Sequence, residues 1–90
     1  MTADEYKALV QPAMDVVVKK HQDYNRGGVT LESYFPFGLK SYAQMLHVKN
    51  QRLLSLASSS APIANEALED TVIDMINYAV FTLAFLKSGR

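Results

Sequence analysis

Four polar side chains follow one face of a predicted helix in the C-terminal third of the sequence. At about 100° per residue, Glu66, Asp70, Asp74 and Asn77 lie within about 80° of one another. Three carboxylates at i, i+4 and i+8 repel one another, so the row is easier to explain if it meets a cation. With Glu69, the carboxylates could bind Mg²⁺, which prefers carboxylate and phosphate oxygens. The alternative is a polar face paired with Lys49, Arg52 or another copy of the chain, and we favour this structural alternative.

A second set of residues combines cations with aromatic rings between Lys19 and Tyr42. Aromatic faces stack on nucleobases, and lysine or arginine neutralises phosphates. The sequence therefore predicts a nucleotide ligand, and the candidate contacts are Tyr6, Lys19, Lys20, Tyr24, Arg26 and Lys40. A competing interpretation places Phe35, Phe37 and Tyr42 in the core beneath a long loop. Gly27 and Gly28 could cradle a phosphate through backbone N–H groups, although such a pair is more often only a turn.

Catalytic motifs are missing from this pattern. The sequence has no Ser-His-Asp order, no HExxH motif and no phosphate P-loop, so we predict no catalytic residue. Asn50 and Asn77 both lie near apolar stripes, where they could hydrogen-bond each other or hold a nucleobase. The sequence leaves these two roles open.

Length and composition set the class of protein. The 90 residues make one domain, and the zero formal net charge argues against a protein that binds nucleic-acid polymers. No cysteine is present, so disulfides and thiolate metal sites are excluded. The N-terminus lacks the order of a signal peptide, and no apolar stretch reaches the ~20 residues of a membrane span. We expect a soluble, cytoplasmic protein with no membrane partner.

Apolar spacing predicts an all-α fold of three helices. The expected helices run from about Ala3 to Tyr24, from Phe37 or Gly38 to Ser58, and from about Ile63 to Lys87. Thr2 and Glu5 fit a capping box at the start of the first helix, and Pro12 predicts a kink or a break near Leu9 to Gln11. We expect the second and third helices to form a long antiparallel pair.

The end of the third helix predicts an oligomer. Residues 78–86 are apolar nearly all round, and a helix apolar on every side is usually buried on every side. Three helices cannot cover all of this surface, so we expect a homo-oligomer. The expected interface residues are Tyr78, Phe81, Phe85 and Leu86, with Met45 and Val48 as additions.

Four segments resemble a known family of phage-borne helical domains. The segments 20–24, 37–39, 49–53 and 66–79 (the last reading EALEDTVIDMINYA) resemble the "nucleotide modification associated" domains. Those domains in turn resemble the all-α MazG-like nucleotide pyrophosphohydrolases, which hold Mg²⁺ with two acidic motifs on adjacent helices. The second motif has a counterpart in Glu66, Glu69, Asp70 and Asp74. The first motif has none, because the first predicted helix offers only Asp15 and Asp23 after its capped first turn, and the helix that ends at Ser58 contains no carboxylate.

The chain is also similar in size and helix order to oligomeric phage anti-CBASS proteins, which sequester cyclic oligonucleotide immune signals. The two resemblances together imply a protein that binds a nucleotide between its protomers, without turnover and without a cofactor. Such a protein would counter host defence in the cytoplasm of an infected cell. The alternative is a Mg²⁺-dependent, MazG-like nucleoside triphosphate pyrophosphohydrolase, and a third class is a purely structural phage interaction protein.

Overall fold

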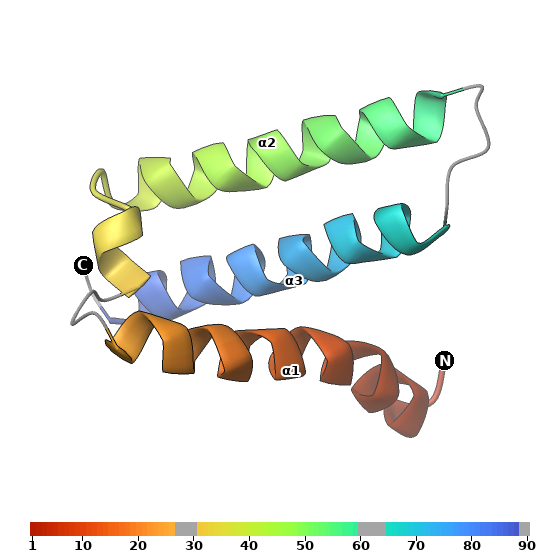
Figure 1. Ribbon diagram of the computed structural model, residues 1–90, viewed down its shortest axis with the longest axis horizontal. Coiled ribbons are helices and arrows are strands. Elements are labelled where there is room, and N and C mark those ends of the chain that lie inside the picture. Colours follow the sequence, from red (N-terminus) through yellow and green to blue (C-terminus); the bar gives the residue numbers. More distant parts are fainter. Residues whose placement is uncertain (27–30, 60–64, 89–90) are drawn as a thin grey trace.

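The protein is all-α, as the apolar spacing predicts. A computed structural model describes residues 1–26, 31–59 and 65–88, and these contain three α-helices, one short 3-10 helix and no strand. The elements are α1 (Ala3–Arg26), η1 (Leu31–Tyr34), α2 (Leu39–Ser58) and α3 (Asn65–Lys87). Figure 1 shows α2 and α3 side by side and antiparallel, which confirms the predicted pair.

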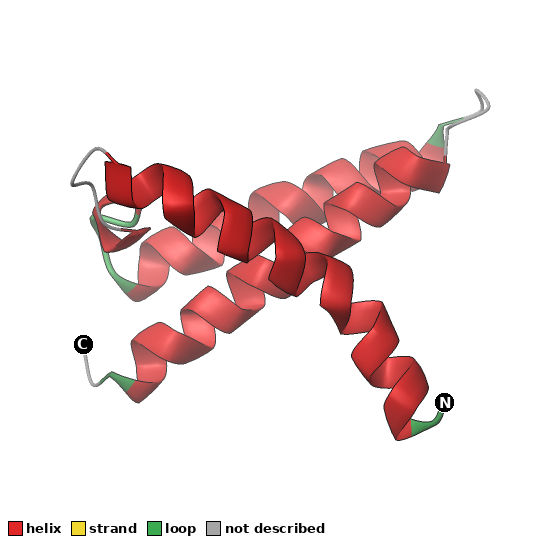
Figure 2. Cartoon of the chain, turned by 60° about the horizontal axis from the view of Figure 1, so that its bottom comes forward, coloured by secondary structure: helices red, strands yellow, loops and turns green. Residues whose placement is uncertain are grey.

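The start of α1 follows the predicted capping box. The backbone N–H of Glu5 donates to Thr2 Oγ1 at 3.1 Å, and the N–H of Thr2 donates to Glu5 Oε1 at 3.4 Å. The helix then runs through Pro12 and past the expected end at Tyr24 as far as Arg26. A break at the proline is therefore wrong, whereas a kink there stays a prediction. Figure 2 shows α1 crossing the α2 and α3 pair.

The connection into α2 contains structure that the apolar pattern does not predict. Where a loop is expected, η1 forms, and the N–H of Phe35 donates to the carbonyl of Glu32. Gly38 follows with φ 62°, a left-handed conformation that glycine adopts without strain. A Cβ at Gly38 would lie 3.3 Å from Phe85 Cζ, so glycine also allows α3 to approach. These features bring the aromatic residues around η1 against α2 and α3.

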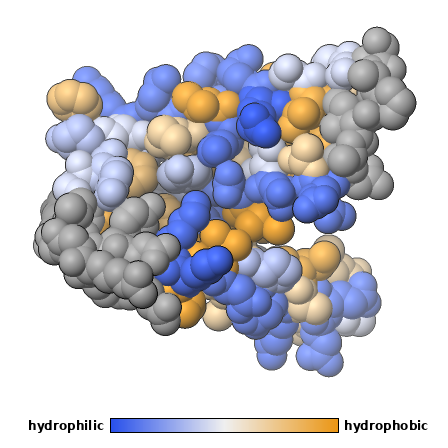
Figure 3. Space-filling model, viewed as in Figure 1, coloured by the Kyte–Doolittle hydropathy of each residue, from blue (hydrophilic) through white to orange (hydrophobic). Residues whose placement is uncertain are grey.

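The three helices form an open layer with α3 in the middle. In Figure 1, α3 lies between α2 and α1, and it is the element that contacts both. An open layer covers only the two flanks of its central helix. Accordingly, the buried apolar side chains among the described residues are Ala13, Phe35 and Tyr42 alone. Figure 3 shows apolar side chains, in orange, reaching the surface of the molecule.

The aromatic residues expected at an oligomer interface also pack within the chain. The rings of Phe35 and Tyr42 stack at 4.1 Å between centroids, and Phe35 meets Tyr78 edge-on at 6.1 Å. Tyr42 also contacts Phe85 at 5.2 Å, and Tyr78 contacts Phe81 at 5.9 Å. Tyr78, Phe81 and Phe85 are half-buried, so each ring uses part of its surface within the chain, and their place at an interface stays a prediction. The rings pack against one another between the start of α2 and the end of α3. Of the other residues expected at the interface, Leu86 and Val48 are exposed and Met45 is half-buried.

Within the described part of the chain, no helix is both long enough and apolar enough to cross a membrane.

Candidate functional site

A pocket of about 210 Å³ opens where all four elements meet. Its lining combines aromatic, aliphatic and polar side chains: Val17, Lys20, Leu31, Tyr34, Phe35, Met45, Asp74, Asn77, Tyr78 and Phe81. The residues come from α1, η1, α2 and α3 and, for Phe35, from the turn after η1, so the pocket exists only in the folded chain. An apolar concave site with a few polar groups is the usual form of a small-molecule site.

Aromatic rings make one wall of the pocket and are held in place from behind. Phe35 is buried and lies between Tyr42 and Tyr78, while Phe81 stands perpendicular to Tyr78. Stacked and edge-on pairs of this kind add about 0.5–1.5 kcal/mol each beyond their buried area. The wall is therefore rigid, and it presents ring faces and edges against which a planar ligand can pack.

Asn77 is the polar group most firmly fixed in the pocket. Its Nδ2 donates a buried hydrogen bond of 3.1 Å to the carbonyl of Ala13, which ties α3 to α1. An asparagine amide has two N–H groups and a carbonyl oxygen, and this bond uses one N–H. Among the described residues, none bonds the rest of the amide. Asn77 can therefore offer a ligand both an acceptor and a donor at a fixed position.

Asn50 does not join Asn77. Asn50 is exposed on α2, while Asn77 is bonded to α1. A hydrogen bond between the two asparagines, one of the two roles left open by the sequence, is therefore wrong. The half-buried residue at this turn of α2 is Lys49, the immediate neighbour of Asn50.

Asp74 brings a carboxylate to the pocket with its charge already balanced. Lys49 Nζ lies 3.1 Å from Asp74 Oδ2 and 5.9 Å from the centroid of the Tyr78 ring. The predicted pairing of the acidic row with α2 is confirmed at this position. Arg52 behaves differently, because its Nε donates to Thr71 Oγ1 at 3.3 Å rather than to a carboxylate.

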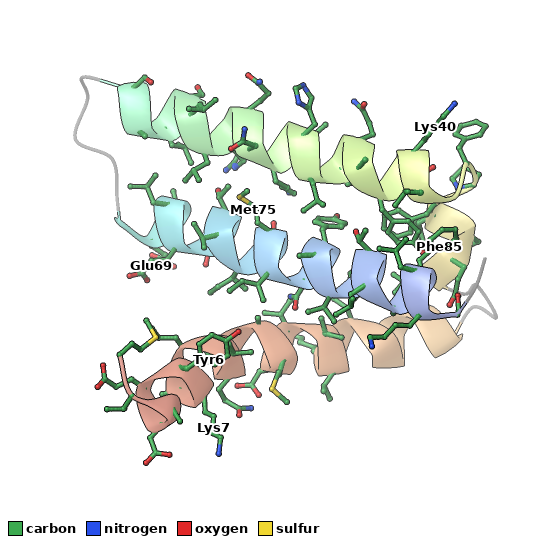
Figure 4. All side chains as sticks on the ribbon, turned by 180° about the vertical axis from the view of Figure 1, so that it is seen from behind. Tyr6, Lys7, Lys40, Glu69, Met75 and Phe85 are labelled. Atoms are coloured by element: carbon green, nitrogen blue, oxygen red, sulfur yellow. The ribbon has the colours of Figure 1, made fainter. Side chains whose placement is uncertain are left out.

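The rest of the acidic row lies in solvent. Glu66, Glu69 and Asp70 are exposed, and Figure 4 shows Glu69 pointing away from α2. Within the described ranges, no three histidine, aspartate or glutamate side chains gather closely enough to hold a metal ion. The ligand set expected for Mg²⁺, which takes several oxygens at once, is therefore not assembled by the part of the chain that the structure describes.

Of the four candidate ligand contacts whose side chains the structure describes, Lys20 is the one placed in the pocket. Its neighbour Lys19 is exposed and does not line it. Tyr6 and Lys40 lie at opposite ends of the molecule in Figure 4. Lys40 lines a separate, shallow depression with Phe37, Leu39 and Ala43. The side chains of Tyr24 and Arg26, like residues 27–30 with the glycine pair, lie outside the described residues.

One face of α3 marks the pocket in the sequence itself. On α3, Asp74, Asn77, Tyr78 and Phe81 fall within about 100° of one face, at about 100° per residue. The polar row thus continues directly into two aromatic residues, and all four line the pocket. Along this face the residues change from acidic to mixed polar and aromatic. The change occurs where α1 and η1 lie against α3.

Comparison with protein families matches residues 20–86 to nucleotide modification associated domain 1. The chain belongs to this family. The match confirms the resemblance read from the four sequence segments, and it spans nine of the ten residues that line the pocket, from Lys20 to Phe81. No curated protein and no solved structure matches the chain. The likeness of this nucleotide modification associated domain to MazG-like enzymes and to anti-CBASS proteins stays a prediction.

Proposed function

We propose that this domain binds a small nucleotide in the pocket and releases it unchanged. The observation that carries the proposal is one pocket in which an aromatic wall, the fixed amide of Asn77 and the cation of Lys20 occur together. Rings pack against a nucleobase, an amide hydrogen-bonds its edge, and a lysine neutralises phosphate. The family description, which refers to nucleotide modification, supports a nucleotide as the ligand class.

The size of the pocket limits how much of the nucleotide enters. At about 210 Å³ it is smaller than the ~300–1,000 Å³ of sites that enclose drug-sized ligands. A single ring system fits such a volume, with sugar and phosphate left outside. Lys20 lines the pocket yet is exposed, so it stands at the rim. The base enters between the aromatic residues and Asn77, and the phosphate meets Lys20.

Binding without turnover agrees with the charges at the pocket. Cleavage of a triphosphate needs positive charge, usually metal ions, to stabilise the transition state. The carboxylate of Asp74 is paired with Lys49, and Glu66 and Asp70 are exposed. A protein that holds a nucleotide and returns it intact lowers its free concentration. If the ligand is a cyclic oligonucleotide signal, this sequestration counters the host defence that uses it.

One experiment separates sequestration from its alternatives. The protein is incubated with a panel of nucleoside monophosphates, triphosphates and cyclic oligonucleotides, with and without Mg²⁺, and free nucleotides are measured by chromatography before and after heat denaturation. We expect one ligand to be depleted and to return in full after heating. New monophosphate and pyrophosphate would instead establish the Mg²⁺-dependent pyrophosphohydrolase. Depletion of no nucleotide would refute the proposal.

Two tyrosines test the location of the site. Tyr34 and Tyr6 have similar exposed fractions, 57% and 63%, but only Tyr34 lines the pocket. Tyr34→Ala should weaken nucleotide binding measured by calorimetry, whereas Tyr6→Ala should not. The reverse result would move the site to the far end of α1.

A further inference from the structure

Between Val72 and Leu86, the side of α3 that faces away from the pocket carries only apolar residues. At about 100° per residue, its residues centre about 180° from the four α3 residues that line the pocket. We call this side the outer face, and it consists of Val72, Ile76, Ala79, Val80, Leu83 and Leu86. Ile76 is half-buried and the other five are exposed. Soluble monomers rarely leave a continuous apolar stripe of this kind in water.

The exposed area of the chain indicates how much surface a partner would cover. Its accessible surface is 6852 Å², whereas a folded monomer of 10.0 kDa exposes about 5,200 Å². The radius of gyration of 14.8 Å likewise exceeds the ~12 Å of a compact 90-residue domain. The excess surface is about 1,600 Å². A standard interface buries ~800 Å² per partner, so the chain exposes enough extra surface for a dimer interface of standard size.

We propose that the outer face binds the outer face of a second copy, with the two α3 helices antiparallel about a two-fold axis. A two-fold interface uses the same patch on both subunits, so an apolar patch is self-complementary. Ala79 lies near the middle of the outer face, and its small side chain allows the two helices to approach closely. The dimer closes the open layer by stacking it on an identical layer.

The charges at the ends of the outer face select the antiparallel arrangement. Glu69 lies beyond one end and Lys87 beyond the other, on the same side of the helix, and both are exposed. Antiparallel pairing places Glu69 of one copy beside Lys87 of the other. It also places the partly positive N-terminal end of each α3 beside the partly negative C-terminal end of its partner. Parallel pairing would place like charges together.

This dimer leaves the pocket open to solvent. The pocket residues and the outer face lie on opposite sides of α3, so each copy keeps a complete pocket. A nucleotide would then be held within one protomer, not between two as the sequence suggests. The dimer does not depend on the proposed function, because nothing in the outer face contributes to the pocket.

Two leucines with equal exposure test the interface. Leu83 on the outer face and Leu54 on α2 are both 52% exposed. By light scattering at micromolar concentration, the wild type should have a mass of about 20 kDa, twice its 10.0 kDa chain mass. Leu83→Asp should give a monomer, and Leu54→Asp should remain a dimer. A monomeric wild type, or a Leu83→Asp variant that stays dimeric, would overturn the proposal.

A charge exchange tests the direction of the helices without altering the apolar stripe. Glu69→Lys should raise the dissociation constant of the dimer severalfold at low salt, because it places two lysines together. The double variant Glu69→Lys with Lys87→Glu should restore the wild-type value. Failure of the second change to restore dimerisation would contradict antiparallel pairing, since both variants keep the same outer face.

Discussion

The two sides of α3 differ in what they contact and in the types of residue that they carry. The pocket side carries Asp74 and Asn77 among aromatic rings, and each polar group has a defined partner on another helix. The outer face carries aliphatic residues only, and five of its six residues are exposed. The pocket side of α3 therefore makes specific polar contacts with α1 and α2, whereas the outer face presents apolar surface. On the pocket side, the polar residues bond to other helices of the same chain. On the outer face, which has no polar residue, we propose that a second copy binds.

This difference also explains why the end of α3, residues 78–86, is apolar nearly all round. A helix in the middle of an open layer is covered on its two flanks by its neighbours. Its remaining side stays bare until a partner covers it. The aromatic residues near the end of α3 belong to the covered side, and the aliphatic ones to the bare side. The predictions below test this division, beginning with the largest expected effect.

Phe35 should be the most sensitive position on the covered side. It is 7% exposed and stacks on Tyr42, so Phe35→Ala should lower the free energy of unfolding by about 3–5 kcal/mol. Phe37 is the matched control, because it is 78% exposed. Phe37→Ala should change stability by less than about 0.5 kcal/mol. Urea denaturation followed by circular dichroism measures both, and equal effects would refute the assignment of Phe35 to the core.

Asn77 should come next, because it is the buried polar link between α3 and α1. Asn77→Ala leaves the carbonyl of Ala13 without its partner, at a cost of about 1–3 kcal/mol. In a chain of this size, 1 kcal/mol lowers the melting temperature by about 4–8 °C. Asn50→Ala is the control, since Asn50 is exposed, and it should leave the melting temperature unchanged. A larger loss at Asn50 would restore the idea that both asparagines are structural.

Local features of the fold could be predicted from the sequence. The capping box of Thr2 and Glu5, the helical spacing and the antiparallel pair depend on residues close in the chain or on short connections. The pairing of Asp74 with Lys49 also followed from charge, because α2 offers cations and no carboxylate. In each of these cases the cause lies in one helix or in two adjacent helices.

The pocket could be predicted only in part, because it depends on how α1 crosses α3. Lys20 lines it and Lys19 does not, although the two residues have similar chemistry and similar exposure. Tyr6 shares a helix with Lys20 but lies at the far end of the molecule. The 3-10 turn that positions Tyr34 and Phe35 has no periodic signal at all. Tertiary contacts, rather than residue type, decided which candidates meet.

The adjacent lysines give the sharpest test of the covered side as a binding site. Lys20→Ala should weaken nucleotide binding about tenfold, or ~1.4 kcal/mol, because it removes the cation at the rim of the pocket. Lys19→Ala removes the same charge one residue away, outside the pocket, and should change affinity much less. Calorimetric titration at two salt concentrations compares them. If both variants lose affinity equally, the lysines act through general charge, and the pocket is not where the phosphate binds.

The smallest effect should come from the acidic row, where Asp74 and Asp70 differ only in what surrounds them. The ion pair of Asp74 with Lys49 is partly exposed, so Asp74→Asn should lower stability by less than about 1 kcal/mol, and less still at high salt. Asp70 is exposed, so Asp70→Asn should leave both the melting temperature and nucleotide binding unchanged.

Millimolar Mg²⁺ should raise the melting temperature of neither the wild type nor the variants, because ligand-induced stabilisation requires a site that binds the ion. A rise of several degrees in the wild type that is lost in Asp70→Asn would show that the row holds a metal. That result would replace sequestration with the pyrophosphohydrolase.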